Sequence, residues 1–373
     1  MEKEEYMKLA IDLARATIGQ TSPNPAVGAV VVNQGEIVGT GAHLKAGEAH
    51  AEVNALRMAG KRADGGTIYV TLEPCSHFGR TPPCADLIIR SGLRKVVIAS
   101  RDPNPLVSGR GIERMRQAGI IVETGVLQKE ADQLNPFFFH FIRHRTPYVT
   151  LKIASSLDGK TATAGKESQW ITGEESRRDG HRLRKIHDAI LVGIGTVLAD
   201  DPSLTVCSGI EGRNPVRIVL DTHLRIREDA RILNDGAAPT WIFTGKGIDR
   251  NKAFRIQNDD VAVIRMPAET IKIRQLLEYL GKKEITSLLV EGGATVHGSF
   301  VLAHAYNRVI AYLAPKLIGG IDALPSVGGA GIEKLADAQE LSFENVEKLG
   351  RDLKITLIPK GGCAGCSLDL SKK

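Results

Sequence analysis

The chain has 373 residues, of which 42% are hydrophobic and 25% are charged, and its net charge is +6. These values are typical of a globular protein with two domains of ordinary size, and they exclude an intrinsically disordered chain. No apolar run reaches the roughly 20 residues of a membrane helix, and the charged residues 1–6 precede no apolar signal core, so we expect a cytoplasmic protein without membrane partners. Five cysteines are too few and too scattered for a disulfide framework. Interspersed acids and bases favour a mixed solvated surface over a nucleic-acid groove.

The first half predicts a helix, a hairpin and then alternating strands and helices. Apolar side chains at helical spacing in Tyr6–Leu13 predict the first helix. Two short apolar runs, 27–32 and 37–41, flank a turn at 33–36 and predict a β-hairpin. The later elements are predicted as helices at 49–59, 84–90 and 112–118, and as strands at 67–72, 95–100 and 120–123. This alternation predicts an α/β layer whose later strands are mostly parallel.

A domain boundary is predicted where the aromatic stretch 137–141 gives way to the polar segment 143–147. The phenylalanines are interpreted as a buried helix face or an interdomain contact, because no basic residues are interleaved to make a base-stacking platform. We therefore expect domains at residues 1–146 and 147–360, followed by a mobile tail at 361–373. Cys363 and Cys366 in this tail have the spacing of only half a zinc site, which favours a disordered tail.

The second half predicts another α/β layer. Strands are expected at 148–154, 189–193, 216–221, 240–244, 261–264, 287–290, 309–314 and 353–358, and helices at 174–186, 270–280 and 294–303. No G-x-G-x-x-G motif follows a strand, so the Rossmann fingerprint is missing. Paired glycines at 193/195 and 292/293 lie between a strand and a helix, where backbone N–H groups can approach a phosphate or simply form a tight turn.

The strongest chemical pattern is His50-Ala51-Glu52, followed by Pro74-Cys75 and Pro83-Cys84. One imidazole and two thiolates match a catalytic zinc site, in which water takes the fourth position and ionises near neutral pH. Residues two apart on a helix point to different sides, so Glu52 is predicted to move protons rather than to bind the metal. A structural zinc site with His77 or His43 as the fourth ligand is the alternative, but it leaves the H-x-E pattern unexplained.

The H-x-E and P-C…C motifs resemble the cytidine-deaminase superfamily. With the long insertion between the cysteines, the segment 23–28 and Asp102-Pro103-Asn104-Pro105, the chain resembles the bifunctional riboflavin-biosynthesis deaminase/reductase family over roughly residues 1–360. The resemblance implies a cytidine-deaminase-like N-terminal domain that uses Zn²⁺ to deaminate 2,5-diamino-6-ribosylamino-4(3H)-pyrimidinone 5′-phosphate at C2. It implies substrate contacts from Asn24, Arg80, Asp102 and Asn104. By themselves, Asn and Asp beside proline also form ordinary turns, and Arg80 is also compatible with a simple surface position.

Three segments of the second half, 152–160, 168–172 and 200–205, resemble the reductase half of the same family. The resemblance implies a dihydrofolate-reductase-like C-terminal domain in which NADPH delivers hydride to ribose C1′ and gives a ribityl side chain. Lys152 or Glu291 is expected to manage the proton that ring opening requires. Substrate contacts are expected from Ser168, Arg184, Leu204 and Glu291. Cofactor contacts are expected from Ala154, Trp170, Thr196, Asp200, Thr222, Gly293, Ala294, Thr295, Val296, His297, Gly298 and Ser299.

Cys207 departs from the family pattern, which commonly has an arginine there as a phosphate ligand. A cysteine cannot replace a guanidinium at a phosphate, so Arg184 alone or Arg213 is expected to hold it. The family also suggests a homo-oligomer, with a tetramer as one form. Two other functions stay open at this point: a nucleic-acid base deaminase with an accessory binding domain, and a catalytically silent second half. Near the zinc motif Phe78 offers almost the only aromatic ring, which favours a free nucleotide over a nucleic acid.

Overall fold

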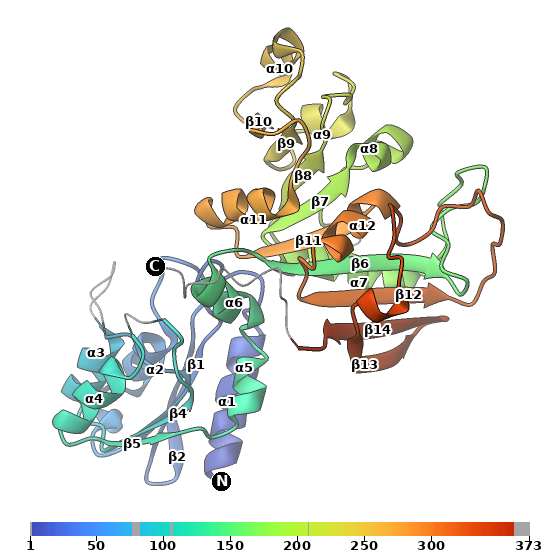
Figure 1. Ribbon diagram of the computed structural model, residues 1–373. Helices are drawn as coiled ribbons and strands as arrows, with labels where there is room; N and C mark the ends of the chain where they lie inside the picture. Colours follow the sequence, from blue (N-terminus) through green and yellow to red (C-terminus); the bar gives the residue numbers. More distant parts are fainter. Residues whose placement is uncertain (1, 77–82, 105–106, 208, 362–373) are drawn as a thin grey trace. The chain divides into compact units, whose positions relative to one another are not determined.

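The structure is a computed structural model that describes residues 2–76, 83–104, 107–207 and 209–361 (Figure 1). The chain divides between Arg143 and His144 into two compact units. Each unit has its own sheet and its own apolar core, so each is described by itself.

The first unit contains a five-stranded sheet with helices on both faces. In chain order its elements are α1 (Lys3–Arg15), β1 (Gly28–Asn33), β2 (Glu36–Ala42), α2 (Ala51–Ala59), the 3₁₀ helix η1 (Gly60–Ala63), β3 (Thr67–Leu72), α3 (Cys84–Arg90), β4 (Lys95–Ser100), α4 (Arg110–Gln117), β5 (Ile121–Thr124), α5 (Gln128–Asp132) and α6 (Pro136–His144). The strand order is β2-β1-β3-β4-β5. β1 is antiparallel to β2 and β3, whereas β3, β4 and β5 are parallel. This confirms the predicted hairpin and the predicted parallel later strands.

Two apolar layers cover the two faces of this sheet. Along β4, Val96 and Ile98 pack into the layer with α2, α3 and α4, whereas Val97 and Ala99 pack into the layer with α1 and α5. Successive side chains of a strand point to opposite faces, and here both faces are buried, which explains the continuous apolar runs of β3 and β4. Because parallel strands end at the same edge of a sheet, the loops that follow β3 and β4 emerge side by side.

The second unit contains a nine-stranded sheet. In chain order its elements are β6 (Tyr148–Ser156), α7 (Glu174–Ile186), β7 (Ala189–Gly193), α8 (Ile194–Asp200), β8 (Val216–Leu220), α9 (Arg231–Asn234), β9 (Thr240–Thr244), α10 (Arg250–Ile256), β10 (Val261–Arg265), α11 (Ile273–Lys282), β11 (Ser287–Gly292), α12 (Ala294–Leu302), β12 (Arg308–Ala314), the 3₁₀ helix η2 (Leu335–Asp337), β13 (Leu341–Leu349) and β14 (Asp352–Pro359). The strand order is β10-β9-β8-β7-β11-β6-β12-β14-β13. The strands from β10 to β12 in that order are parallel, and β14 is antiparallel to both β12 and β13.

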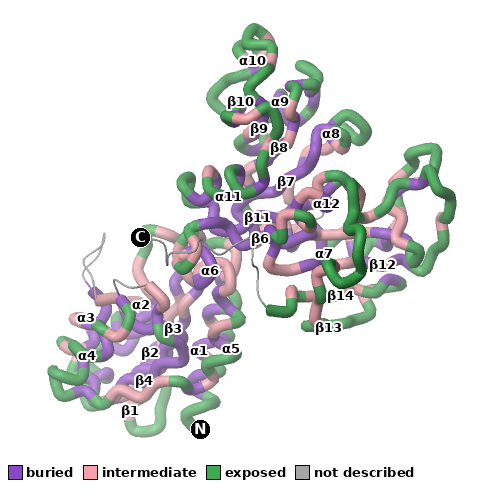
Figure 2. Tube along the Cα trace, in the orientation of Figure 1, coloured by how far each residue is buried: buried purple, intermediate pink, exposed green. Residues whose placement is uncertain are grey.

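The core of the second unit lies on the central strands. Figure 2 shows β6, β7 and β11 largely buried, and every residue of β7 is buried. β13 is the edge strand, and most of its residues are exposed. The catalytic side chains predicted for this unit therefore start from strands that are held on both sides, which fixes their backbone positions.

Several predicted features can be compared directly with this fold. The aromatic stretch forms α6, in which Phe139 and Phe141 are buried, as predicted for a buried helix face. The sequence did not predict α5, α8, α9, α10 or β13. Within the described ranges no helix is long and apolar enough to cross a membrane. Of the predicted tail, only residue 361 is described, so Cys363 and Cys366 lie outside the described residues.

Candidate active sites

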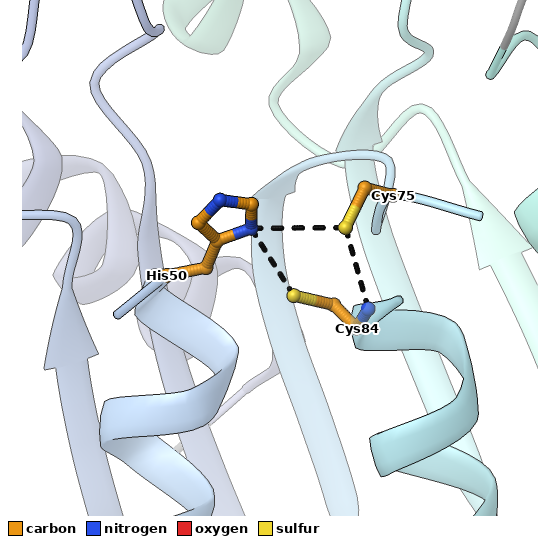
Figure 3. Close-up of side chains that lie close together, drawn as sticks. All are labelled: His50, Cys75 and Cys84. Atoms are coloured by element: carbon orange, nitrogen blue, oxygen red, sulfur yellow. Dashed lines mark hydrogen bonds between the residues drawn. The ribbon is translucent and has the colours of Figure 1, made fainter. Parts of the chain in front are cut away.

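His50, Cys75 and Cys84 point toward one another from three separate segments of the first unit (Figure 3). His50 Nδ1 lies 3.2 Å from Cys84 Sγ and 3.7 Å from Cys75 Sγ, and the three ligand atoms all lie within 4.8 Å of one another. Tetrahedral zinc with bonds of about 2.0–2.3 Å places a nitrogen and a sulfur ligand roughly 3.5 Å apart. The donor types and their spacing therefore fit a zinc ion.

Two helix starts and one strand end place these ligands. His50 is the extended N-cap of α2, Cys84 is the first residue of α3, and Cys75 follows β3. The backbone N–H of Cys84 donates to Cys75 Sγ at 3.3 Å, and the N–H of Ala85 donates to the Cys75 carbonyl at 3.1 Å. N–H groups at a helix start stabilise an anion, so α3 favours the thiolate form that a metal requires.

The position of α2 depends on two glycines of β2. A Cβ on Gly39 would lie 2.2 Å from the carbonyl oxygen of Ala55, and one on Gly41 would lie 2.3 Å from that of Ala51. No real Cβ contact is this short, so only glycine allows the helix to lie so close to the strand. This close packing sets where His50 and Glu52, at the start of α2, stand relative to the sheet.

The two thiols differ in their acidity. A hydrogen bond from the Cys84 thiol and then one from His50 lower the pKa of Cys75 to about 4, against the opposing effect of burial. The pKa of Cys84 is raised, first by its hydrogen bond to Cys75 and then by burial. The pair therefore retains one thiol proton, and binding of a metal releases it because thiolates are the ligating form.

Glu52 lies beside the cluster but is not one of its ligands. Its side chain is buried, with 3% of the residue exposed, and burial followed by the nearby Cys75 raises its pKa. A raised pKa lets the carboxyl hold a proton that an ordinary glutamate would release, and a general acid/base has to hold a proton before it donates it. The arrangement fits the role predicted for Glu52.

His43 does not complete the cluster as a fourth ligand. Its Nδ1 lies 3.1 Å from the Ala49 carbonyl oxygen, and its Nε2 lies 3.1 Å from the side-chain nitrogen of Asn24. A carbonyl can only accept, so Nδ1 carries the proton and Nε2 accepts from the Asn24 amide. Among the residues that the structure describes, the cluster has three ligands, and His77 lies outside them. The sequence did not single out His43 as the residue that orients Asn24.

The loop after β4 holds the other predicted substrate residues of this unit. Asp102 is buried and accepts the backbone N–H of Asn104 at 2.8 Å, while the Asn104 carbonyl accepts from Val107 and Ser108. Both residues thus build the turn, as their position beside proline predicts. Asp102 also lines a cavity of about 450 Å³ at the carboxyl ends of β4 and β5. Arg80 lies outside the described residues.

In the second unit, Lys152, Arg184 and Glu291 form one charged cluster. Arg184 donates from Nε and Nη2 to the two Glu291 oxygens at 2.7 and 2.9 Å, and Lys152 Nζ lies 4.0 Å from Glu291 Oε2. Burial alone raises the pKa of Glu291, but Arg184 and then Lys152 outweigh it and hold that pKa at about 2. Glu291 is therefore an ionised carboxylate with a bidentate partner, the strongest ion-pair geometry.

The two arginines proposed for the substrate phosphate are both engaged in the structure. Arg184 Nη1 donates to the Thr205 carbonyl at 3.0 Å in addition to its bonds with Glu291. Arg213 pairs with Asp188. Cys207 is exposed, and its Sγ lies 3.0 Å from His181 Nε2, so His181 is the polar neighbour of this position that the sequence did not reveal.

Two of the predicted cofactor residues, Thr196 and Asp200, lie on α8. Burial raises the pKa of Asp200, and a hydrogen bond from Ser168 opposes that rise, so these two residues face each other. Thr196 faces Gly293, because a Cβ on that glycine would lie 3.6 Å from Thr196 Oγ1. Trp170 is 61% exposed, and the Arg177 guanidinium lies 4.6 Å from its ring centroid. An exposed ring of this kind is available to a ligand.

The glycine-rich start of α12 has an open side and a covered side. Gly293 and Thr295 are exposed, and Ala294, Val296 and Ser299 are half-buried. His297 is buried, with its ring nitrogens 3.0 Å from the Ser326 carbonyl oxygen and 3.3 Å from that of Val290. Gly298 is buried against Gly328.

The three other predicted residues lie at separate points of the second unit. Ala154 packs with Leu183 and Tyr312 under α7. Thr222 follows β8, and its carbonyl accepts from Gly245 at 2.9 Å. Leu204 is buried with φ at 53°, a conformation that is uncommon for leucine.

Comparisons with known proteins identify the family of each half of the chain. Residues 1–100 match the family model of the cytidine and deoxycytidylate deaminase zinc-binding region, and residues 147–355 match that of the RibD C-terminal domain. The riboflavin biosynthesis protein RibD of Bacillus amyloliquefaciens is 52% identical over 97% of this chain and 98% of its own length. The chain belongs to the RibD family. Among solved RibD-family structures, Acinetobacter baumannii RibD (form 1) is 39% identical, covers 95% of this chain and 98% of its own, and has a TM-score of 0.86.

A second solved structure names both activities of the family. It is a diaminohydroxyphosphoribosylaminopyrimidine deaminase/5-amino-6-(5-phosphoribosylamino)uracil reductase from Thermotoga maritima, 38% identical, covering 95% of this chain and 98% of its own, with a TM-score of 0.82. The chain is accordingly a bifunctional enzyme of riboflavin biosynthesis, with a zinc-dependent deaminase and an NADPH-dependent reductase. The predicted α/β fold class is confirmed. A nucleic-acid base deaminase and a catalytically silent second half are not supported.

Proposed function

We propose that residues 1–146 deaminate 2,5-diamino-6-ribosylamino-4(3H)-pyrimidinone 5′-phosphate, and that residues 147–360 then reduce the ribose of the deaminated product. The convergence of His50, Cys75 and Cys84 within 4.8 Å, beside the buried Glu52, supports the first assignment most directly. The ion-paired cluster of Lys152, Arg184 and Glu291 supports the second.

In the deaminase, His50, Cys75 and Cys84 would hold the zinc, which supplies a water that ionises near neutral pH. Glu52 takes up one proton on its buried carboxyl and passes it to the pyrimidine ring nitrogen. It then carries a second proton to the amino group, which departs as ammonia. Its burial keeps bulk water from competing for that proton. Asn24 faces the substrate in the orientation set by His43. The remaining substrate contacts come from Arg80, Asp102 and Asn104.

In the reductase, bound NADPH supplies a hydride to ribose C1′ of the ring-opened imine. The Lys152 ammonium donates a proton toward the ring oxygen, which becomes a hydroxyl when the ring opens. Glu291 stays ionised and orients both Lys152 and Arg184. Substrate contacts come from Ser168, Arg184, Leu204 and Glu291. Cofactor contacts come from Ala154, Trp170, Thr196, Asp200, Thr222 and the segment 293–299.

We also propose a cytoplasmic homo-oligomer, with a tetramer as the expected form. Three large apolar side chains between β12 and β13 support an association surface: Leu317 is 77% exposed, Ile321 96% and Leu335 89%. Large apolar side chains that are exposed along one connection are available for burial against a partner.

The test follows the pyrimidine by mass after incubation with the full chain. Without NADPH, the amino group should be exchanged for a hydroxyl and the reaction should stop there. With NADPH, the deaminated product should gain two hydrogens. Removal of zinc by a chelator should abolish the first step and leave NADPH oxidation intact when the deaminated compound is supplied. Loss of both steps on chelation, or of neither, would contradict the assignment.

A further inference from the structure

The register of the second sheet places three functional side chains on one face. Lys152 on β6 lies opposite Ile310 on β12, so Tyr312, two residues further along, points to the same side as Lys152. On the other neighbouring strand, Val290 of β11 lies opposite Leu151, which brings Glu291 level with Lys152. This is the face that α7 covers, because Leu183 of α7 packs on Ile310 and Tyr312.

Tyr312 is fixed by a buried polar network rather than by apolar packing alone. Its side chain is fully buried, and its hydroxyl donates to Asp179 Oδ2 of α7 at 2.6 Å. The same oxygen accepts from Lys354 Nζ at 2.8 Å, and Lys354 lies directly opposite Tyr312 in the β12–β14 pair. Asp179 is buried and Lys354 is half-buried. Burial of a charged carboxylate is costly, and simple apolar packing of a tyrosine would not require one beside its hydroxyl. The network instead holds the phenol ring in one orientation.

The held ring faces Lys152. Lys152 Nζ lies 6.0 Å from the centroid of Tyr312, at the outer limit of a cation–π contact, and 4.0 Å from Glu291 Oε2. Gly180 of α7 lies alongside, since a Cβ at that position would meet Lys152 Cε at 3.9 Å. The flexible lysine stem is therefore bounded by the ring, the helix backbone and the carboxylate.

We propose that Tyr312 is a positioning residue of the reductase, whose ring face keeps the Lys152 ammonium next to Glu291 and directed at the substrate. The inference rests on the proposed role of Lys152 as the proton donor. A lysine has many rotamers, and a displacement of about 1 Å at a reacting group costs up to roughly 100-fold in rate. The role of Tyr312 is then to restrict Lys152 to the rotamers that direct its ammonium at the substrate.

The test compares variants that keep or remove the ring in the full chain. Tyr312→Leu should lower reductase kcat by about 10- to 100-fold while the KM for NADPH stays unchanged. Tyr312→Phe keeps the ring face and should retain most of the wild-type kcat. Tyr148→Leu is the matched control, because Tyr148 is also a buried tyrosine on this sheet whose ring faces a cation, Arg308 at 5.7 Å. It should leave kcat at the wild-type value once the protein is shown to be folded.

A double-mutant cycle with Lys152→Met separates positioning from a general effect on the fold. If Tyr312 acts through Lys152, Tyr312→Leu should have little further effect on the residual single-turnover rate of Lys152→Met. The inference would be overturned if the rate loss of the double variant equalled the product of the two single losses. It would also be overturned if Tyr312→Phe and Tyr312→Leu lost the same amount of kcat. Full activity of Lys152→Met would instead refute the proposed role of Lys152. The deamination rate of each variant serves as a control, because it shows whether the first unit is folded and active. If Tyr312→Leu does not fold, Tyr312→Met takes its place.

Discussion

Replacement of Glu291 by glutamine should destabilise the second unit by several kilocalories per mole. The carboxyl has a pKa of about 2 against an ordinary value of 4.5, because Arg184 and Lys152 stabilise its ionised form despite burial. At 1.36 kcal/mol per pH unit, this difference corresponds to ~3 kcal/mol. Removal of one partner from a buried ion pair costs about 3–5 kcal/mol, because the other charge stays behind unpaired, so the two estimates agree. The folded-state pKa is depressed, so this stability is present above about pH 4.5 and is lost as pH falls through 2.

The chain offers a selective assay for this change. Both of its tryptophans, Trp170 and Trp241, lie in the second unit, so their fluorescence follows the unfolding of that unit in urea. With a slope of about 1–3 kcal/mol per molar urea, the midpoint of Glu291→Gln should fall by about 1 M or more. Glu228→Gln is the control, because Glu228 forms an exposed pair with Arg255 at 2.7 Å, and exposed pairs contribute little to stability. Equal midpoints for the two variants would refute the reasoning.

Three further predictions concern acidity, catalysis and phosphate binding. Burial lowers the pKa of His187 from 6.5 to about 4, so the unfolded chain binds a proton at a higher pH than the folded chain. Between pH 6.5 and 4 the free energy of unfolding of the wild type should therefore fall by about 3 kcal/mol more than that of His187→Gln, measured by the same fluorescence assay. Equal losses would show that His187 is not held neutral. Glu52→Gln should keep its zinc, measured by elemental analysis, but lose at least ~100-fold in deamination, whereas Cys75→Ser should lose the metal; near-normal turnover by Glu52→Gln rejects its role. Cys207→Arg should lower the reductase KM for the phosphorylated substrate by roughly tenfold and leave a dephosphorylated analogue unaffected; improved binding of both compounds would show that position 207 acts through folding.

The strands and helices with buried apolar faces were predictable from the sequence. The ranges predicted for β3, α3, β4 and α7 coincide with the structure, because each has an uninterrupted apolar pattern or a charge pattern that suits one helix. β13 was missed for a physical reason. It is a solvent-exposed edge strand, and a register shift between Phe343 and Asn345 breaks the alternation of period two that reveals a strand.

Helix α10 was also missed, although, unlike β13, it has a local sequence signal at its start. α10 begins after Asp249, whose carboxylate accepts the backbone N–H groups of Asn251 and Lys252 at 2.8 and 3.2 Å. An aspartate followed by a short amphipathic stretch is a helix-start pattern, but seven residues are too few for the periodicity to stand out.

The metal ligands were predictable because the H-x-E and P-C…C motifs contain ligand types typical of a catalytic zinc site. The residues that support the sites were not predictable. His43 reaches Asn24 across 19 residues, and Tyr312 reaches Asp179 across 133. Such contacts depend on sheet register and helix packing, which no local pattern encodes. The sequence also offered Arg213 as a phosphate ligand, and only the fold places it beside Asp188.

The central claim is that one chain holds two independent active sites, with Glu52 required at the first and Lys152 at the second. The most direct measurement is the mass of the pyrimidine that accumulates when each full-length variant receives the diaminopyrimidine phosphate and NADPH. Glu52→Gln should leave the substrate unchanged, Lys152→Met should stop at the deaminated compound, and a mixture of the two variants should complete both steps. Reduction of the aminated substrate by Glu52→Gln, or a failure of Lys152→Met to deaminate, would contradict the account.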